Sequence, residues 1–293
     1  MNIQSKIMKT KNYLLTFGLI LTSVVSTYFV TTSVAQQGAA TQIVTADNEY
    51  QVGAILFMQK AAEYRALCLQ SFNWAKRTLD DDNKSKKRLS KAERKMPRAI
   101  VVDIDETMLD NSPAQAYNAK NRLPFDLKVW YAWGEMRKAK AIPGAVEFAN
   151  YAKSKGVRIF YVSNRDEVQK AATIDNLKAV GFPDVSDENV MLRQVDATTQ
   201  KPISTKEPRR MEIAKMYRIV TLIGDNLNDL ADVYENKSVA ARFDEVEKAK
   251  ALYGNKFIVI PNAMYGDWEN AIYKDDTSNA TKTVKRANAL ELP

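Results

Sequence analysis

The chain has no histidine and a single cysteine, Cys68, among its 293 residues. The absence of histidine excludes Ser-His-Asp hydrolases and any zinc or haem site with imidazole ligands. A single cysteine excludes an intramolecular disulfide and a cysteine zinc site. No arginine stands among the six residues after Cys68, so a thiolate nucleophile backed by an arginine in its own loop is not supported. A buried structural thiol is the expected role, because cysteine is among the most buried residue types.

The N-terminal segment has the pattern of a targeting sequence. Three lysines precede an apolar stretch over residues 13–30, and small residues follow at 33–35. We therefore expect residues 1–35 to be a signal peptide that is removed on export, which makes the protein periplasmic or secreted. A retained membrane anchor is the alternative, and an uncleaved leader is the only membrane contact that we expect. Met8 is a second candidate start besides Met1, because a compact signal peptide also begins there.

The charge balance is mildly basic. The whole chain carries +8, and removing the three leader lysines leaves +5. Such a charge suits anionic substrates or cell-surface polymers. No stripe of basic residues with interleaved aromatic residues is present, so we expect no nucleic-acid binding. The basic run at 84–88 is interpreted as a solvated loop rather than a binding patch.

Two carboxylates follow the first strongly apolar run of the chain. The run at 99–102 predicts a buried strand, and Asp103 and Asp105 come directly after it. In an open α/β sheet, ligands bind at the carboxyl ends of the strands. Two neighbouring acids suit a Mg²⁺ site, or a nucleophile working with a general acid. A pair of solvated aspartates at a strand end is the alternative, because so short a motif is weak by itself.

Further polar groups follow two other predicted strands. The strand at 217–223 ends before Asp225 and Asp229, and the strand at 157–162 ends before Ser163, Asn164 and Arg165. Lys206 lies between these two motifs in a polar stretch, with Lys201 as its nearest rival. The order of acid pair, hydroxyl, lysine and acid pair resembles the four-part signature of the haloacid dehalogenase (HAD) superfamily.

Five longer segments make the resemblance more specific: 103–113, 142–148, 162–165, 224–229 and 261–268. They resemble class C acid phosphatases, the lipoprotein e family of acid phosphatases and 5′-nucleotidases, and the resemblance extends over about 48–273. Most bacterial members carry a lipobox cysteine after the leader, and its absence here argues against a lipid anchor.

The alternation of strands and helices predicts an α/β fold, a HAD-like, Rossmann-like parallel sheet with helices on both faces. We also expect a small helical cap domain over the site. The acidic run at 80–83 is expected to end the first long helix. The predicted organisation is a disordered linker at 36–47, an N-terminal helical segment joining the cap at 48–96, a phosphatase core at 97–277 with a cap insertion at about 114–140, and a C-terminal tail at 278–293.

The resemblance implies roles for the acids. Asp103 would be the nucleophile that forms an aspartyl-phosphate, and Asp105 would protonate the leaving group and later deprotonate water. Mg²⁺ would be held by Asp103, the main-chain carbonyl of Asp105 and Asp225, with Asp229 as a ligand or a neighbouring acid.

The resemblance also implies contacts to the substrate. Ser163, Asn164, Arg165 and Lys206 would bind the phosphate group, and Ser163 and Lys206 would also assist catalysis. Phe125 and Tyr265 would stack on a nucleobase or nicotinamide ring; the alternative is that either ring belongs to the core.

These assignments predict an exported, Mg²⁺-dependent acid phosphatase that acts on small phosphorylated metabolites, above all nucleoside 5′-monophosphates. A phosphotransferase that passes the phosphoryl group to an alcohol is one alternative. A non-catalytic surface-binding protein on the same fold is another. The sequence leaves a homo-oligomer open.

Overall fold

The computed structural model describes residues 47–293. The predicted signal peptide at 1–35, and all but the last residue of the predicted linker at 36–47, lie outside the described residues. Among the helices of 47–293, none combines the length and the apolar character needed to cross a bilayer.

The centre of the fold is a sheet of five parallel strands in the order β5-β4-β1-β6-β7. β1 occupies the middle, and its last residue, Val102, pairs with Tyr161 on one side and Ile223 on the other. The parallel α/β sheet expected from the sequence is confirmed. The strands are β1 (Arg98–Val102), β4 (Val157–Asp166), β5 (Val190–Arg193), β6 (Arg218–Gly224) and β7 (Phe257–Val259).

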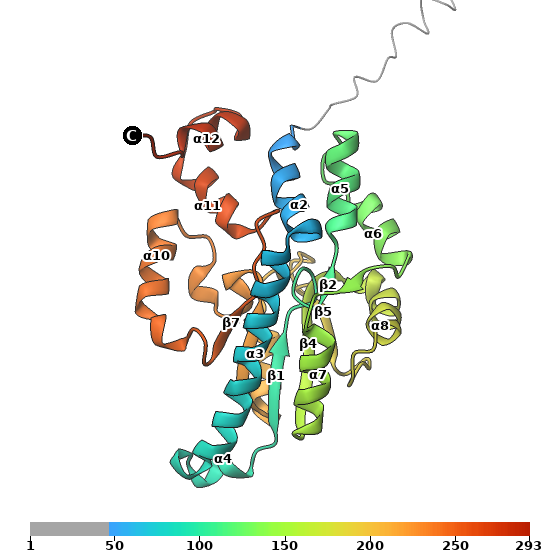
Figure 1. Ribbon diagram of the computed structural model, residues 1–293, viewed down its shortest axis with the longest axis vertical. Coiled ribbons are helices and arrows are strands. Elements are labelled where there is room, and N and C mark those ends of the chain that lie inside the picture. The colour runs from blue at the N-terminus through green and yellow to red at the C-terminus, as the bar shows by residue number, and fades with distance from the viewer. Residues whose placement is uncertain (1–46) are drawn as a thin grey trace, which may run out of the picture. The chain divides into compact units, whose positions relative to one another are not determined.

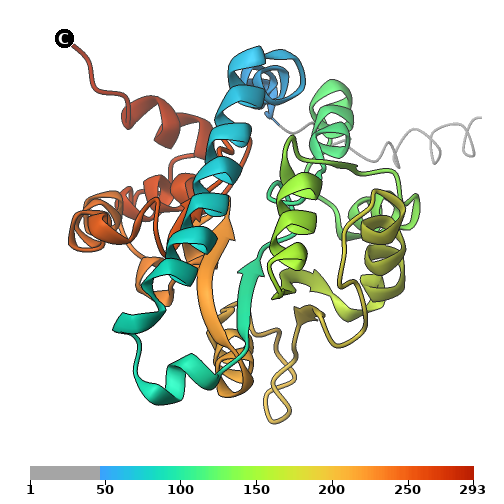
Figure 2. The same cartoon turned by 60° about the horizontal axis from the view of Figure 1, so that its bottom comes forward.

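Both faces of this sheet are buried, which explains why its strands read as continuous apolar runs. Along β1, Ile100 and Val102 belong to the larger core, whereas Ala99 and Val101 belong to a second core on the opposite face. Cys68 lies in the larger core with no exposed surface, as the sequence predicted. Figure 2 shows α3 running across the sheet beside β6. The larger core packs under α3 (Ala62–Lys84) and α7 (Ala145–Ser154), and the second under α9 (Glu207–Met216).

The end of α3 corrects one expectation. The acidic run at 80–83 was expected to end the helix, yet α3 continues to Lys84. Two of its acids have tertiary partners: Asp80 accepts a hydrogen bond of 2.6 Å from the hydroxyl of Tyr151, and Asp82 accepts two from the guanidinium of Arg218. The expectation was wrong because these contacts satisfy the carboxylates within the helix.

The segment between β1 and α7 forms the helices that lie near the carboxyl ends of the strands. It contains α5 (Ser112–Asn121) and α6 (Leu127–Glu135), flanked by the antiparallel pair β2 (Leu109–Asp110) and β3 (Lys140–Ala141). In Figure 1, α5 and α6 lie at the end towards which β1 points, together with α2 (Val52–Lys60). The predicted cap insertion corresponds to this segment, and its role as a cap stays a prediction.

The C-terminal tail contains a helix of its own. The guanidinium of Arg286, in α12 (Lys282–Asn288), lies 3.5 Å from the centre of the Tyr50 ring and 3.6 Å from the carboxylate of Asp47. The two ends of the described chain are therefore in contact. The remaining helices are α4 (Lys91–Lys95), α8 (Lys170–Ala179), α10 (Val239–Lys248), α11 (Asp267–Asp275) and α12 (Lys282–Asn288).

Candidate active site

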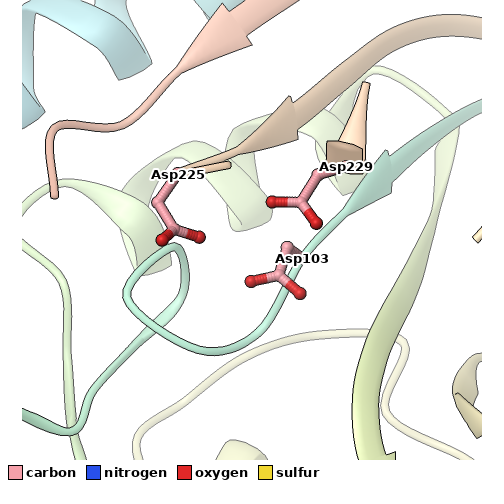
Figure 3. Close-up of side chains that lie close together, drawn as sticks. All are labelled: Asp103, Asp225 and Asp229. Atoms are coloured by element: carbon pink, nitrogen blue, oxygen red, sulfur yellow. The ribbon is translucent and has the colours of Figure 1, made fainter. Parts of the chain in front are cut away.

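Three carboxylates meet where β1 and β6 end. One oxygen from each of Asp103, Asp225 and Asp229 lies within 4.8 Å of the others, and Figure 3 shows the three groups pointing toward one another. Asp103 follows β1 directly, and its N–H still donates to the carbonyl of Ile223 at 2.9 Å. The meeting follows from topology, because β1 and β6 are parallel neighbours whose carboxyl ends share one edge.

Asp225 is oriented by two polar side chains. The hydroxyl of Thr107 donates to its Oδ1 at 3.1 Å, and the amide of Asn262 donates to its Oδ2 at 2.8 Å. The N–H of Asp225 donates back to the Thr107 hydroxyl at 3.0 Å. Sequence reasoning gave Thr107 and Asn262 no role, although both stand inside the segments that matched the family.

Asp229 is brought close by the short turn after β6. Its Oδ2 accepts a hydrogen bond of 3.0 Å from the N–H of Asn226. A Cβ at position 224 would lie 2.4 Å from the Asp229 carboxylate, so only glycine fits there. Gly224 therefore permits the side chain of Asp229 to reach the two other acids.

Lys206 lies between two of these acids. Its ammonium group contacts Asp103 and lies 2.7 Å from Oδ1 of Asp229. The side chain is buried, with the residue 5% exposed, whereas Lys201 is exposed. Of the two lysines that the sequence offered, Lys206 is the one at the site.

The cluster carries excess negative charge. If all three carboxylates are ionised, they outnumber the one ammonium group by two negative charges in a largely buried space. Burial raises the pKa of Asp103 well above its ordinary range, and the charges of Asp229 and Asp225 add to this effect while Lys206 opposes it. Burial, and then Asp229, raise the pKa of Asp225 to about 7. A hard divalent cation fits this donor set, because it prefers carboxylate oxygens and offsets their charge.

Asp105 faces away from this cluster and toward β4. Its carboxylate accepts hydrogen bonds from the amide of Asn111 at 2.8 Å and the hydroxyl of Ser163 at 3.0 Å. The guanidinium of Arg165 donates to Oδ1 through Nη2 at 2.8 Å and Nε at 2.9 Å. Burial raises the pKa of Asp105, but Arg165 and the other donors outweigh burial and hold the pKa below its usual value.

Arg165 contacts the carboxylate of Asp105. Its buried guanidinium also contacts the hydroxyl of Thr173, which lies 3.0 Å from Nη1, and its expected role in binding the phosphate group stays a prediction. Ser163 is also fully buried, and its Oγ accepts the N–H of Arg165 at 3.1 Å. The strand end of β4 therefore orients Asp105 in this structure.

Asn164 is exposed and bonded to two neighbours. Its amide donates a hydrogen bond of 2.7 Å to the carbonyl of Ser204, and its Oδ1 accepts a hydrogen bond of 2.6 Å from Nη2 of Arg209. Arg209 is 1% exposed and also donates to the carbonyl of Ser163 at 2.7 Å. It joins the end of β4 to the loop that carries Lys206. Sequence reasoning missed Arg209, and its only signal was a position three residues after Lys206.

The two candidate stacking residues lie in different environments. Phe125, between α5 and α6, is 65% exposed. Tyr265 is half-buried, packs against the larger core, and donates its hydroxyl hydrogen bond to the carboxylate of Glu106. Glu106 is fully buried, has a φ of +57°, and also accepts the N–H of Asn111 at 2.8 Å. The loop after β1 is thus connected to Tyr265.

Known proteins resemble this chain in both sequence and structure. The family model of HAD superfamily, subfamily IIIB (Acid phosphatase) matches residues 15–268. The crystal structure of the class C acid phosphatase from Bacillus anthracis with tungstate bound is similar at 39% identity and a TM-score of 0.74, covering 84% of this chain and 98% of that one.

Curated relatives match over a shorter stretch. Acid phosphatase 1 of Solanum lycopersicum is 29% identical over 135 residues, which are 44% of this chain and 51% of the relative. Vegetative storage protein 1 of Arabidopsis thaliana is 25% identical over 135 residues, 45% of this chain and 48% of the relative. The chain spans about half the length of these curated relatives. The family model covers most of this chain, and the structural match covers nearly all of the Bacillus anthracis enzyme. The predicted family is therefore confirmed: the chain belongs to the HAD superfamily, subfamily IIIB, the acid phosphatases.

Proposed function

We propose that the protein is an acid phosphatase that hydrolyses phosphate monoesters through an aspartyl-phosphate on Asp103. The observation that carries this proposal is the contact of Lys206 with both Asp103 and Asp229 inside a buried group of three carboxylates. Lys206 opposes the rise in the pKa of Asp103 and places a fixed positive charge beside the carboxylate that would attack the anionic ester. The Bacillus anthracis relative binds tungstate, an oxyanion, which is consistent with an oxyanion site here.

We propose Mg²⁺ as the cofactor, held by Asp103, Asp225, Asp229 and the main-chain carbonyl of Asp105. When bound, the ion would offset the negative charge of the acids and polarise the phosphoryl group. Its octahedral preference for oxygen ligands agrees with a donor set that contains no nitrogen or sulfur.

The first step is attack of the Asp103 carboxylate on phosphorus. The ester P–O bond breaks as the Asp103–phosphorus bond forms, and Asp105 in its protonated form gives its proton to the departing alkoxide. Lys206 stabilises the negative charge on the phosphoryl oxygens during transfer. Ser163 and Asn164 as ligands of those oxygens stay predictions.

The second step is hydrolysis of the aspartyl-phosphate. Asp105, now a carboxylate, takes a proton from a water molecule whose oxygen attacks phosphorus. The bond between Asp103 and phosphorus breaks, inorganic phosphate leaves, and both acids return to their starting states.

Nucleoside 5′-monophosphates are the proposed substrates. An aromatic ring that is 65% exposed, at Phe125, and the half-buried ring of Tyr265 provide surfaces suited to a flat base. Stacking of a base on an aromatic side chain contributes about 1–3 kcal/mol. We further propose that residues 1–35 direct export, which N-terminal sequencing of the mature protein tests.

Turnover of a chromogenic phosphate ester tests the proposed function. We expect hydrolysis that requires a divalent cation and is absent in Asp103→Asn. Chromophore and inorganic phosphate are measured together, with and without an added alcohol. Equal release means hydrolysis, whereas less phosphate than chromophore in the presence of alcohol means a phosphotransferase. No turnover in wild-type protein loaded with Mg²⁺ would favour a non-catalytic, surface-binding role.

A further inference from the structure

A cavity lies at the end of the sheet opposite to the carboxylates. Its volume is about 270 Å³, and α4 and the first residues of β1 and β6 form its walls. Figure 1 shows α4 at this end, far from α5 and α6. The five residues of β1 lie between the cavity and the carboxylate cluster, and at roughly 3.3 Å per residue they span about 16 Å. The cavity is lined by Leu89, Glu93, Arg94, Met96, Pro97, Arg98, Lys155, Gly156 and Arg218.

The strand register concentrates positive charge there. Arg98 begins β1 and Arg218 begins β6, and the two residues are direct partners in the parallel ladder. Lys155 stands two residues before Val157, which pairs with Arg98 from the other side. Like charges are thus placed side by side at the amino ends of the three central strands.

The acids around the cavity do not balance these cations. Four basic residues line it, and Glu93 is the one acidic residue in the lining. Asp82 lies behind, where it contacts both Arg98 and Arg218. Four cations against two carboxylates leave a charge of +2. Burial, and then the charge of Arg218, lower the pKa of the nearby Lys256, which agrees with an excess of positive charge.

Several donors of this cluster have no protein acceptor. The terminal nitrogens of Arg218 are bonded to Asp82, but its Nε is buried and lacks a hydrogen-bond partner within residues 47–293. Across the same described part of the chain, neither the guanidinium of Arg94 nor the ammonium of Lys155 has an ion pair; the latter lies 5.0 Å from the centre of the Tyr151 ring. Arg94 and Lys155 are exposed, so their charged groups are open to a ligand in the cavity.

We propose that this cavity is an anion site, which binds a phosphate group through Arg94 and Lys155, while Arg98 and Arg218 add positive charge at its wall. A phosphate dianion carries the charge that neutralises the excess of +2, and arginine and lysine are its usual protein partners. The group is either free inorganic phosphate or part of a phosphorylated polymer. The site is separate from the carboxylate cluster and does not rest on the proposed catalytic function.

Equilibrium dialysis with radiolabelled inorganic phosphate tests the site on the mature protein. The double variant Arg94→Gln/Lys155→Gln removes both proposed contacts. The double variant Lys87→Gln/Lys91→Gln is the matched control, because it removes the same charge from exposed residues at the same end that do not line the cavity. All of these side chains lie on the surface, and thermal melts check that each variant folds.

We expect the first variant to bind one phosphate fewer per chain than the wild type, or the same number with one site at least tenfold weaker. The control variant should bind as the wild type does, and turnover of a small chromogenic ester should be equal in all three proteins. Unchanged phosphate binding in the first variant, or an equal loss in both variants, overturns the proposal.

A second measurement separates the two sources of phosphate. Long-chain polyphosphate is added to the dialysis of wild type and of the Arg94→Gln/Lys155→Gln variant. Displacement of labelled phosphate from the wild type alone supports a polymer as occupant, and retention of the label supports free phosphate. Displacement of equal amounts from both proteins overturns the cavity as the site, since the polymer then acts elsewhere.

Discussion

The guanidinium of Arg165 pairs with the carboxylate of Asp105, with Nη2 2.8 Å and Nε 2.9 Å from Oδ1. Both groups are held from other sides as well, Arg165 by Thr173 and Asp105 by Asn111. The charge of Arg165 disfavours protonation of Asp105, although the proposed mechanism needs a protonated Asp105. The pH dependence of the enzyme should therefore depend on the contact between Arg165 and Asp105.

We predict an acid optimum for kcat/KM, which reports the free enzyme. Arg165 outweighs the effect of burial and holds the pKa of Asp105 below its usual value. The protonated fraction of Asp105 falls as pH rises through this low pKa, so the rate of leaving-group departure falls on the same side. A profile of kcat/KM that rises steadily into alkaline pH would contradict the assignment of Asp105.

Arg165→Gln should move the falling limb to higher pH by about one unit or more, because burial then raises the pKa of Asp105 without an opposing charge. Arg165→Lys keeps the charge and should move the limb less. Profiles of kcat/KM for the three proteins provide the check. A limb that stays in place in Arg165→Gln would mean that another group sets it.

The meeting of Asp103 and Asp225 could be predicted from the sequence because it follows from topology alone. Apolar runs identify β1 and β6, and since these strands are parallel neighbours, the acids after them lie at one edge of the sheet whatever the details of packing. The partner of Arg165 was not predictable in that way. Ser163 and Arg165 are two residues apart in β4, so their side chains point to the same side of the strand. Only the register of β4 against β1 brings that side next to Asp105.

Long-range partners explain the expectation that failed at the end of α3. Asp80 is bonded to Tyr151, 71 residues away, and Asp82 to Arg218, 136 residues away. Local composition favoured a stop at 80–83, and tertiary contacts overrode it. Arg209 was missed for the same reason, since its acceptors on β4 lie 45 and 46 residues away.

Asp103→Asn should abolish turnover and leave the fold intact. The amide cannot form the acyl phosphate, so no more than a trace of activity is expected. Without a metal ion, the melting temperature should stay equal or rise, because the change removes one of three buried acids while Asp229 still pairs with Lys206. Activity assays and thermal melts on the same preparation test both parts. Substantial activity in the variant would show that Asp103 is not the nucleophile.

Chelation should inactivate the enzyme, Mg²⁺ should restore it, and Ca²⁺ should be a poor substitute because it prefers more ligands at longer distances. Full activity after exhaustive treatment with EDTA and dialysis would exclude the metal role.

The metal-free protein should also lose stability as pH rises. The pKa of Asp225 is about 7 in the folded protein against an ordinary 3.8. An acid with a raised folded-state pKa binds its proton more tightly when folded, so the free energy of unfolding falls between about pH 4 and pH 7. Added Mg²⁺ should restore stability at pH 7.5, and Asp225→Asn should flatten the pH dependence. Thermal melts at pH 5 and 7.5 give the test; equal melting temperatures without metal would contradict it.

Selectivity for nucleotides should depend on the rings of Phe125 and Tyr265. Replacing either by alanine should raise KM for a nucleoside monophosphate much more than for a small alkyl phosphate. Stacking contributes equally before and during phosphoryl transfer, so its loss changes KM and spares kcat. A loss of about 1–3 kcal/mol corresponds to roughly five- to a hundred-fold in kcat/KM. Tyr265→Phe is the matched control, because it keeps the ring and removes only the hydrogen bond to Glu106. If Tyr265→Phe lowers kcat/KM as much as Tyr265→Ala does, and on both substrates, the hydrogen bond to Glu106 in the loop after β1 accounts for the effect, and stacking does not. The proposed substrates would then be phosphate monoesters in general.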